Sequence, residues 1–238
     1  MFGFALDTGN TPEIISLIDQ VYNIEDSNGI VYKKVRLVNV HDVHDIPALI
    51  SVVEKAYKMD LNNGFIYRLD QQKKILSGTF ISDIKISKSK RNIILTGFVW
   101  TKPKGYQKAL DMKLNNEINK KYIWKNFKKD ELQGWLVHAL HSTQPAINRE
   151  NINIQIDGND FHSLDGFFCT LGEEINGVSG YFGRNLYALY DCLRGDFGVK
   201  SISELNWINH KRSKKILKTK FNQIVEIFEN YNVKVHLN

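Results

Sequence analysis

The sequence predicts two domains, a β-rich (α+β) N-terminal domain over residues 1–146 and an α/β C-terminal domain over residues 147–238. In the first part, short runs of β-branched and aromatic residues are separated by Asn, Gly and Pro, which is typical of strands joined by turns. From residue 151 onward, short apolar strands alternate with helical stripes, which favours a parallel sheet. The boundary is placed at the turn-forming segment Ser142–Ala146.

The N-terminal domain is expected to consist mainly of strands. Residues 46–57 and residues 129–141 have the apolar spacing of helices, whereas residues 106–127 fit neither period. The expected strands are Phe2–Leu6, Val31–Val40, Gly64–Leu69, Lys74–Ile86 and Asn92–Trp100.

The C-terminal domain is expected to hold a three-stranded parallel sheet with packed helices. Ser163 and Asn185 are residue types that cap helices, and each precedes an apolar helical stripe. The expected strands are 152–156, 202–207 and 233–237, and further helices are expected at 210–218 and 221–231. Because every helix has its own apolar stripe, residues 148–238 are expected to fold alone.

Composition excludes several classes of protein. Hydrophobic residues make up 42% and charged residues 24%, which are ordinary globular values. No apolar run reaches the ~18 residues that a membrane span needs, and the first residues lack the pattern of a secretory signal. Cys169 and Cys192 are too few for a disulfide framework or a zinc knuckle. These features predict a reduced, cytoplasmic protein.

Charge is distributed unevenly along the chain. The net charge is +6, and residues 1–149 carry 22 Lys and Arg against 15 Asp and Glu. Residues 151–199 carry seven acidic residues against Arg184 and Arg194 only. An acidic segment therefore lies within a basic chain, and the overall sign describes the N-terminal domain.

The segment 186–193 carries the most informative pattern. Its leucines are spaced to face inward, which places Tyr187 and Asp191 together on the solvent side, flanked by Tyr190 and Arg194. Two tyrosines around a carboxylate are typical of the centre of an interface. The alternative is a surface aspartate beside two half-buried tyrosines.

The run YFGRNLYALYDCLRG, residues 181–195, resembles the loop and second helix of the barstar family, intracellular inhibitors of the ribonuclease barnase. The resemblance covers residues 151–238, including Trp207 after the middle strand and the last helix running into the final strand. It implies a three-stranded parallel sheet with packed helices. It also implies occlusion of a nuclease active site by an acidic helix and loop.

The resemblance also implies which residues contact the partner. Asp191 matches the central aspartate of the family. Tyr187, Arg184 and Asn230 stand where the family has acidic residues, so the cognate nuclease is expected to have a less basic or differently shaped site. The expected partner-binding residues are Asp191, Tyr187, Tyr190, Tyr181, Phe182, Arg184, Arg194 and Asn230.

We therefore expect a protein inhibitor, an antitoxin or immunity protein that binds a ribonuclease toxin, and not an enzyme. No cofactor, small-molecule substrate, membrane or direct nucleic-acid contact is expected. The alternative is a nucleic-acid-binding protein that acts through the basic N-terminal domain.

Two further patterns have simpler interpretations. The pairs His41/His44 and His138/His141 lack the cysteine partners and the His-Glu-x-x-His spacing of zinc sites, so ordinary histidines are expected. Within residues 120–129, lysines alternate with Tyr122, Trp124 and Phe127, which makes this segment the better candidate for RNA binding in the chain.

Overall fold

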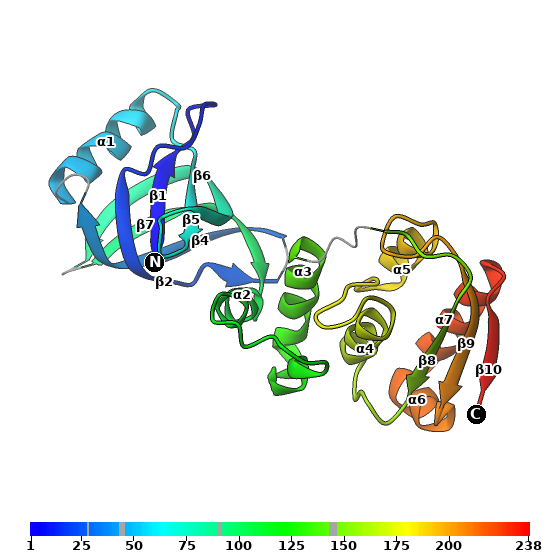
Figure 1. Ribbon diagram of the computed structural model, residues 1–238. Coiled ribbons are helices and arrows are strands. Elements are labelled where there is room, and N and C mark those ends of the chain that lie inside the picture. Colours follow the sequence, from blue (N-terminus) through cyan, green and yellow to red (C-terminus); the bar gives the residue numbers. More distant parts are fainter. Residues whose placement is uncertain (28, 43–45, 90–91, 143–146) are drawn as a thin grey trace. The chain divides into compact units, whose positions relative to one another are not determined.

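The computed structural model describes residues 1–27, 29–42, 46–89, 92–142 and 147–238 (Figure 1). The chain divides into two compact units, Met1–Pro103 (the N-terminal unit) and Lys104–Asn238 (the C-terminal unit). This division lies well before residue 146, where the sequence places the boundary. The physical reason is the packing of residues 104–142, described below.

The N-terminal unit is built on one sheet that closes on itself. Its strand order is β3-β7-β4-β2-β1-β5-β6, and β6 also pairs with β7. The strands are β1 (Phe2–Leu6), β2 (Ser16–Tyr22), β3 (Glu25–Asp26), β4 (Gly29–Asp42), β5 (Gly64–Leu69), β6 (Ile75–Ser89) and β7 (Asn92–Pro103).

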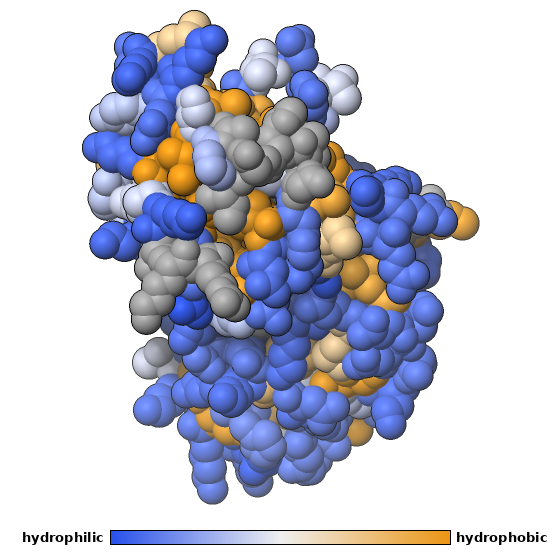
Figure 2. All heavy atoms as spheres, turned by 90° about the vertical axis from the view of Figure 1, so that its left-hand side faces the viewer, coloured by the Kyte–Doolittle hydropathy of each residue, from blue (hydrophilic) through white to orange (hydrophobic). Residues whose placement is uncertain are grey.

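Alternation along these strands separates an apolar interior from an outer face. In β7, Ile93, Leu95 and Val99 are buried while Phe98 and Trp100 are exposed. The interior is completed by α1 (Ile46–Lys58), which packs against β6 and contributes side chains such as Leu49 and Val53. Figure 2 shows hydrophobic atoms among hydrophilic ones on one face of the molecule.

The five strands predicted for this unit are present, and two more were missed. In β2, Asp19 and Gln20 interrupt the alternation of apolar residues, and β3 is only two residues long. Both are recognisable only through their partners β4 and β7. Asn28, one of the residues expected to form the turns between these strands, and the second member of the His41/His44 pair lie outside the described residues.

The C-terminal unit contains the predicted three-stranded parallel sheet, in the order β10-β9-β8. Its strands are β8 (Ile152–Asp157), β9 (Ile202–Ile208) and β10 (Lys234–Leu237), and its later helices are α4 (Leu164–Asn176), α5 (Leu186–Leu193), α6 (His210–Leu217) and α7 (Thr219–Asn230). Trp207 of β9 is fully buried and stacks on Phe167 of α4, with ring centroids 5.3 Å apart.

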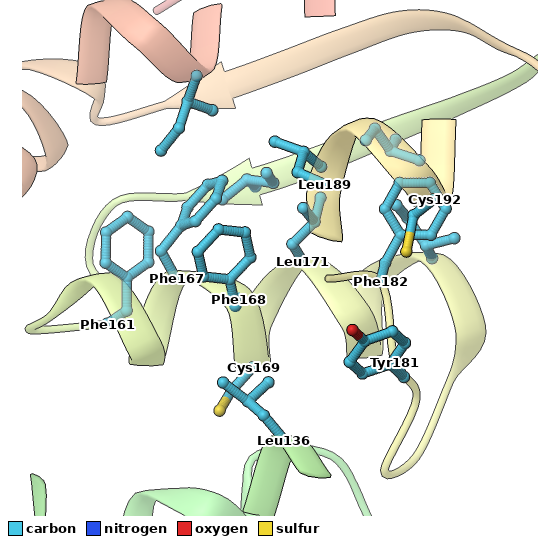
Figure 3. Close-up of a cluster of buried hydrophobic side chains, with 14 of the residues drawn as sticks. Leu136, Phe161, Phe167, Phe168, Cys169, Leu171, Tyr181, Phe182, Leu189 and Cys192 are labelled. Atoms are coloured by element: carbon cyan, nitrogen blue, oxygen red, sulfur yellow. The ribbon is translucent and has the colours of Figure 1, made fainter. Parts of the chain in front are cut away.

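Residues 104–142, which we call the extension, belong to the C-terminal unit. They form α2 (Tyr106–Leu114), the 3-10 turns η1 (Ile123–Asn126) and η2 (Lys129–Glu131), and α3 (Leu132–Ser142). Trp135 and Leu136 of α3 are fully buried, and Leu136 points toward Cys169 of α4 (Figure 3). One continuous hydrophobic core therefore spans the extension and the sheet.

A buried carboxylate also joins the extension to α4. Glu173 has no exposed surface, and it accepts hydrogen bonds from the Tyr122 backbone N–H (2.6 Å), the Trp124 indole N–H (3.2 Å) and the Ser179 backbone N–H (3.1 Å). Burial nevertheless raises its pKa. Because buried donors need partners, Glu173 makes residues 122–124 part of the same folding unit.

The position of the extension changes the interpretation of the charge. Residues 1–103 carry 13 Lys and Arg against 11 Asp and Glu, whereas residues 104–149 carry nine against four. Most of the positive excess thus lies in the extension, which packs with the acidic C-terminal segment. The N-terminal unit itself is only weakly basic.

The lysine-rich stretch of the extension does not form the RNA-binding surface that its sequence favours. Trp124 and Phe127 are buried, so their rings are not available to bases. Lys121 pairs with Glu174 and Lys125 pairs with Asp160, each at 3.0 Å. Its aromatic and basic residues therefore hold the extension on the C-terminal unit.

The described residues were searched for a membrane-spanning helix and for a metal site. Among them, no helix combines the length and the apolar character that a bilayer crossing requires. They also contain no group of three His, Cys, Asp or Glu side chains arranged to hold a metal ion. His138 is buried, with its Nε2 atom 3.0 Å from the Ser142 hydroxyl, so it is a core histidine.

Candidate functional site: helix α5 and the preceding loop

The loop that leads into α5 lies directly on α4. A Cβ atom on Gly172 would lie 2.3 Å from the carbonyl oxygen of Gly180, and one on Gly180 would lie 2.4 Å from the carbonyl oxygen of Gly172. Only glycine fits at both positions. Asn176 adds a hydrogen bond from its side-chain amide to the Tyr181 carbonyl oxygen at 2.8 Å. The loop is therefore fixed in place by α4.

Tyr181 and Phe182 anchor this loop from the inside. They are 5% and 0% exposed, and Figure 3 shows both within the hydrophobic cluster. Burial raises the pKa of the Tyr181 hydroxyl. The sequence grouped both with the partner-binding residues, but the structure places their side chains in the core, where they position the loop.

Helix α5 begins as the sequence predicts. The Asn185 side-chain oxygen accepts a hydrogen bond of 2.8 Å from the Ala188 backbone N–H, which satisfies a donor of the first turn. Leu189 and Cys192 are buried beneath the helix. Burial, with the nearby Asp191 carboxylate, raises the pKa of the Cys192 thiol to about 12, so this cysteine packs as a small apolar residue.

The outer side of α5 presents an aromatic ring and a carboxylate to solvent. Tyr187 is 83% exposed, and the side chain of Asp191 is 63% exposed. Asp191 lies 3.6 Å from the guanidinium of Arg194, whose side chain is 71% exposed. An exposed pair of this kind contributes at most about 1 kcal/mol. Both charged groups can therefore be rearranged by a partner at small cost.

Tyr190 of α5 and Asn230 of α7 border this surface where the two helices meet. Tyr190 is half-buried and lies beside Tyr231, with ring centroids 6.1 Å apart. The Tyr231 hydroxyl donates a hydrogen bond of 3.3 Å to the Tyr190 carbonyl oxygen, which ties the end of α7 to α5. Asn230, the last residue of α7, is exposed next to this contact.

Arg184 is held by a residue that sequence reasoning missed. The side-chain amide of Gln133, in α3, donates to the Arg184 carbonyl oxygen at 3.2 Å and to the Asp165 carboxylate at 2.7 Å. The Gln133 oxygen accepts from the Arg184 guanidinium at 3.5 Å. No local pattern marks Gln133, because its role depends on the packing of the extension against the loop.

A groove lies beside the exposed ring of Tyr187. Its volume is about 380 Å³, and it runs between α5 and α7. Tyr187 and Tyr190 line the wall formed by α5. On the α7 wall, Lys220 contributes a positive charge and Glu226 a negative one. The groove can accept a side chain of a partner protein.

Residues 152–236 match the sequence model of the barstar family, described as barstar (barnase inhibitor). The C-terminal segment is a barstar domain. The match covers β8 through most of β10, and it leaves the extension and the N-terminal unit outside. No curated protein matches the chain.

The barstar domain confirms the resemblance drawn from residues 181–195, together with the predicted fold. The family is one of ribonuclease inhibitors, so the domain implies a ribonuclease partner.

The exposed charged groups on and before α5 are Asp191, Arg194 and the partly exposed Arg184. The surface is thus not strongly acidic.

Proposed function

We propose that the barstar domain binds a ribonuclease of the barnase type and blocks its active site with α5 and the preceding loop. The observation that carries this proposal is the exposure of Asp191 and Tyr187 on one side of a helix whose other side is fixed in the core. Ribonucleases bind phosphates with cationic side chains, and a carboxylate on a rigid helix can occupy the same position through charge-assisted hydrogen bonds.

The charges around Asp191 specify the partner further. Arg184 and Arg194 would repel the cations of a strongly basic active site, so the cognate ribonuclease carries acidic side chains at the rim of its site. Tyr187, in place of an acidic residue, supplies an aromatic anchor where the enzyme would hold a base. The groove beside it accommodates a side chain of the partner.

We further propose that this ribonuclease is a toxin and that the protein acts in the cytoplasm as its immunity protein. An inhibitor that occludes an active site needs no catalytic group of its own, so the protein is not an enzyme in this proposal. The site needs no cofactor or metal, since recognition rests on shape, aromatic contact and charge.

The proposal is tested by inhibition of a panel of barnase-type ribonucleases, each assayed on a fluorogenic RNA substrate with the full chain added in increasing amounts. We expect stoichiometric inhibition of at least one enzyme with an acidic rim and weak inhibition of barnase itself. Undiminished activity across the whole panel at micromolar inhibitor would contradict the proposal.

A further inference from the structure

The outer face of the closed sheet in the N-terminal unit carries a row of aromatic side chains from four neighbouring strands. We call it the aromatic strip, and it consists of Tyr32 of β4, Phe98 and Trp100 of β7, Phe80 of β6 and Phe65 of β5. Tyr32, Phe98 and Trp100 are 49%, 44% and 41% exposed. Soluble proteins rarely expose a contiguous apolar patch without a binding role.

The rings of the strip contact one another across the strands. The ring centroids of Tyr32 and Phe98 are 5.0 Å apart, those of Phe80 and Trp100 are 4.8 Å apart, and those of Phe65 and Phe80 are 5.0 Å apart. The alternating residues beneath, such as Ile81 and Val99, are fully buried in the interior. The strip is therefore a fixed platform on a rigid sheet.

Cations border the strip along two of its strands. Lys34 and Lys85 both pair with Thr96, which lies two residues before Phe98 on the same face of the sheet. Arg36 continues the row along β4, where its guanidinium lies 4.5 Å from the centre of the Tyr22 ring. All three cationic residues are exposed.

Acidic groups also lie close to the strip, and Asp83 is near enough to Lys85 to help raise the pKa of that lysine. Asp83, which lies in the bulge of β6, accepts a hydrogen bond of 3.2 Å from the Asn62 side chain. Asp26 of β3 pairs with Lys33 at 2.8 Å. Lys34, Arg36 and Lys85 together outweigh Asp83, so the charge beside the rings is positive on balance, which complements a polyanion.

We propose that the aromatic strip binds single-stranded nucleic acid. Bases would stack on the exposed rings of Trp100, Phe98 and Tyr32, while Lys34 and Lys85 would face the phosphates. Neighbouring strands lie about 4.8 Å apart, so the four strands present a platform about 14 Å wide. Sheet surfaces of this kind stack two or three bases. The strip belongs to the N-terminal unit, and this proposal does not depend on the proposed inhibition by α5.

The test measures binding of the full chain to fluorescein-labelled single-stranded 12-mers, oligo(U) and oligo(dT), by fluorescence anisotropy. We expect both to bind, with an affinity that falls steeply with salt, and a duplex of the same length to bind more weakly. Replacing Trp100 or Phe98 by Leu removes a stacking surface and should weaken binding at least about fivefold. Trp100→Phe keeps a ring and should bind nearly as wild type.

Tyr187→Ala, which removes a more exposed ring from the other unit, is the matched control and should bind both oligonucleotides normally. Melting curves of the Leu variants show that the sheet remains folded. The proposal is overturned by an absence of oligonucleotide binding at low salt, by normal binding of the Leu variants, or by a preference for the duplex. It is also overturned if Trp100→Leu impairs ribonuclease inhibition and leaves oligonucleotide binding unchanged, since the strip would then be a protein-binding surface.

Discussion

The carboxylate of Glu173, buried in α4, accepts a hydrogen bond of 2.6 Å from the backbone N–H of Tyr122. This contact joins the barstar domain to a segment that lies outside the family match. Together with Trp135 and Leu136 in the shared core, it shows that the extension is a structural part of the C-terminal unit.

We expect Glu173→Gln to destabilise the protein by about 1–3 kcal/mol. The carboxylate receives three N–H donors, and an amide would turn its own donor toward at least one of them, leaving buried polar groups unpaired. Chemical denaturation of both proteins measures the loss. Glu229→Gln, an exposed change on α7, is the control and should stay within about 0.5 kcal/mol of wild type. Equal stability of Glu173→Gln would show that the contact is dispensable.

The boundary of the folding unit can be tested with fragments. Residues 104–238 should melt cooperatively, near the temperature of the same unit in the full chain. Residues 148–238, which the sequence predicts to fold alone, lose the packing of Trp135 and Leu136 and should be less stable by at least ~3 kcal/mol. Equal stability of the two fragments would place the extension outside the folding unit.

His138 gives the C-terminal unit a dependence on pH. Burial, with Lys113 and His141 nearby, lowers its pKa to about 4 from the ordinary value of 6.5. Below pH 6.5 the unfolded chain binds a proton that the folded protein excludes, so stability falls as the pH drops from about 6.5 to about 4. Across this range the wild type should lose ~3 kcal/mol more than His138→Gln. Parallel pH profiles of the two unfolding free energies would contradict this.

Much of the C-terminal fold follows from local pattern. Ser163 and Asn185 cap α4 and α5 through contacts three residues away, so the sequence beside each of them is sufficient to predict the cap. The outward position of Tyr187 and Asp191 follows equally from helical spacing. The sequence therefore predicted the face of α5 without any knowledge of tertiary contacts.

Features that depend on distant contacts were not predictable in this way. Tyr181 and Phe182 stand in a loop, where no period separates inward from outward side chains, and their burial depends on the approach of Gly180 to Gly172. Gln133 reaches Arg184 only because α3 packs on α4. The compact units divide after Pro103 and not at residue 146, because the extension packs on α4 through contacts between residues far apart in the sequence.

Tyr187→Ala should lower affinity for the cognate ribonuclease and leave stability unchanged. The ring is almost fully exposed, so the fold loses little when it is removed. An aromatic anchor contributes contact area but leaves no charged group unpaired, so the loss should be smaller than that caused by removing the carboxylate. Calorimetric titration of a panel ribonuclease that the wild type inhibits measures this loss of affinity. Unchanged affinity would exclude Tyr187 from the interface.

In the proposed complex the Asp191 carboxylate occupies a phosphate position of the ribonuclease, and Asp191→Ala removes this group alone. The measurement is the inhibition constant of this variant beside wild type and Glu229→Ala, with the melting temperature of each. Asp191 is exposed, so Asp191→Ala should melt as wild type, whereas its affinity should fall by about 2–5 kcal/mol because a buried cation of the enzyme is left unpaired. Glu229→Ala should retain full affinity. Equal inhibition by wild type and Asp191→Ala would contradict the claim.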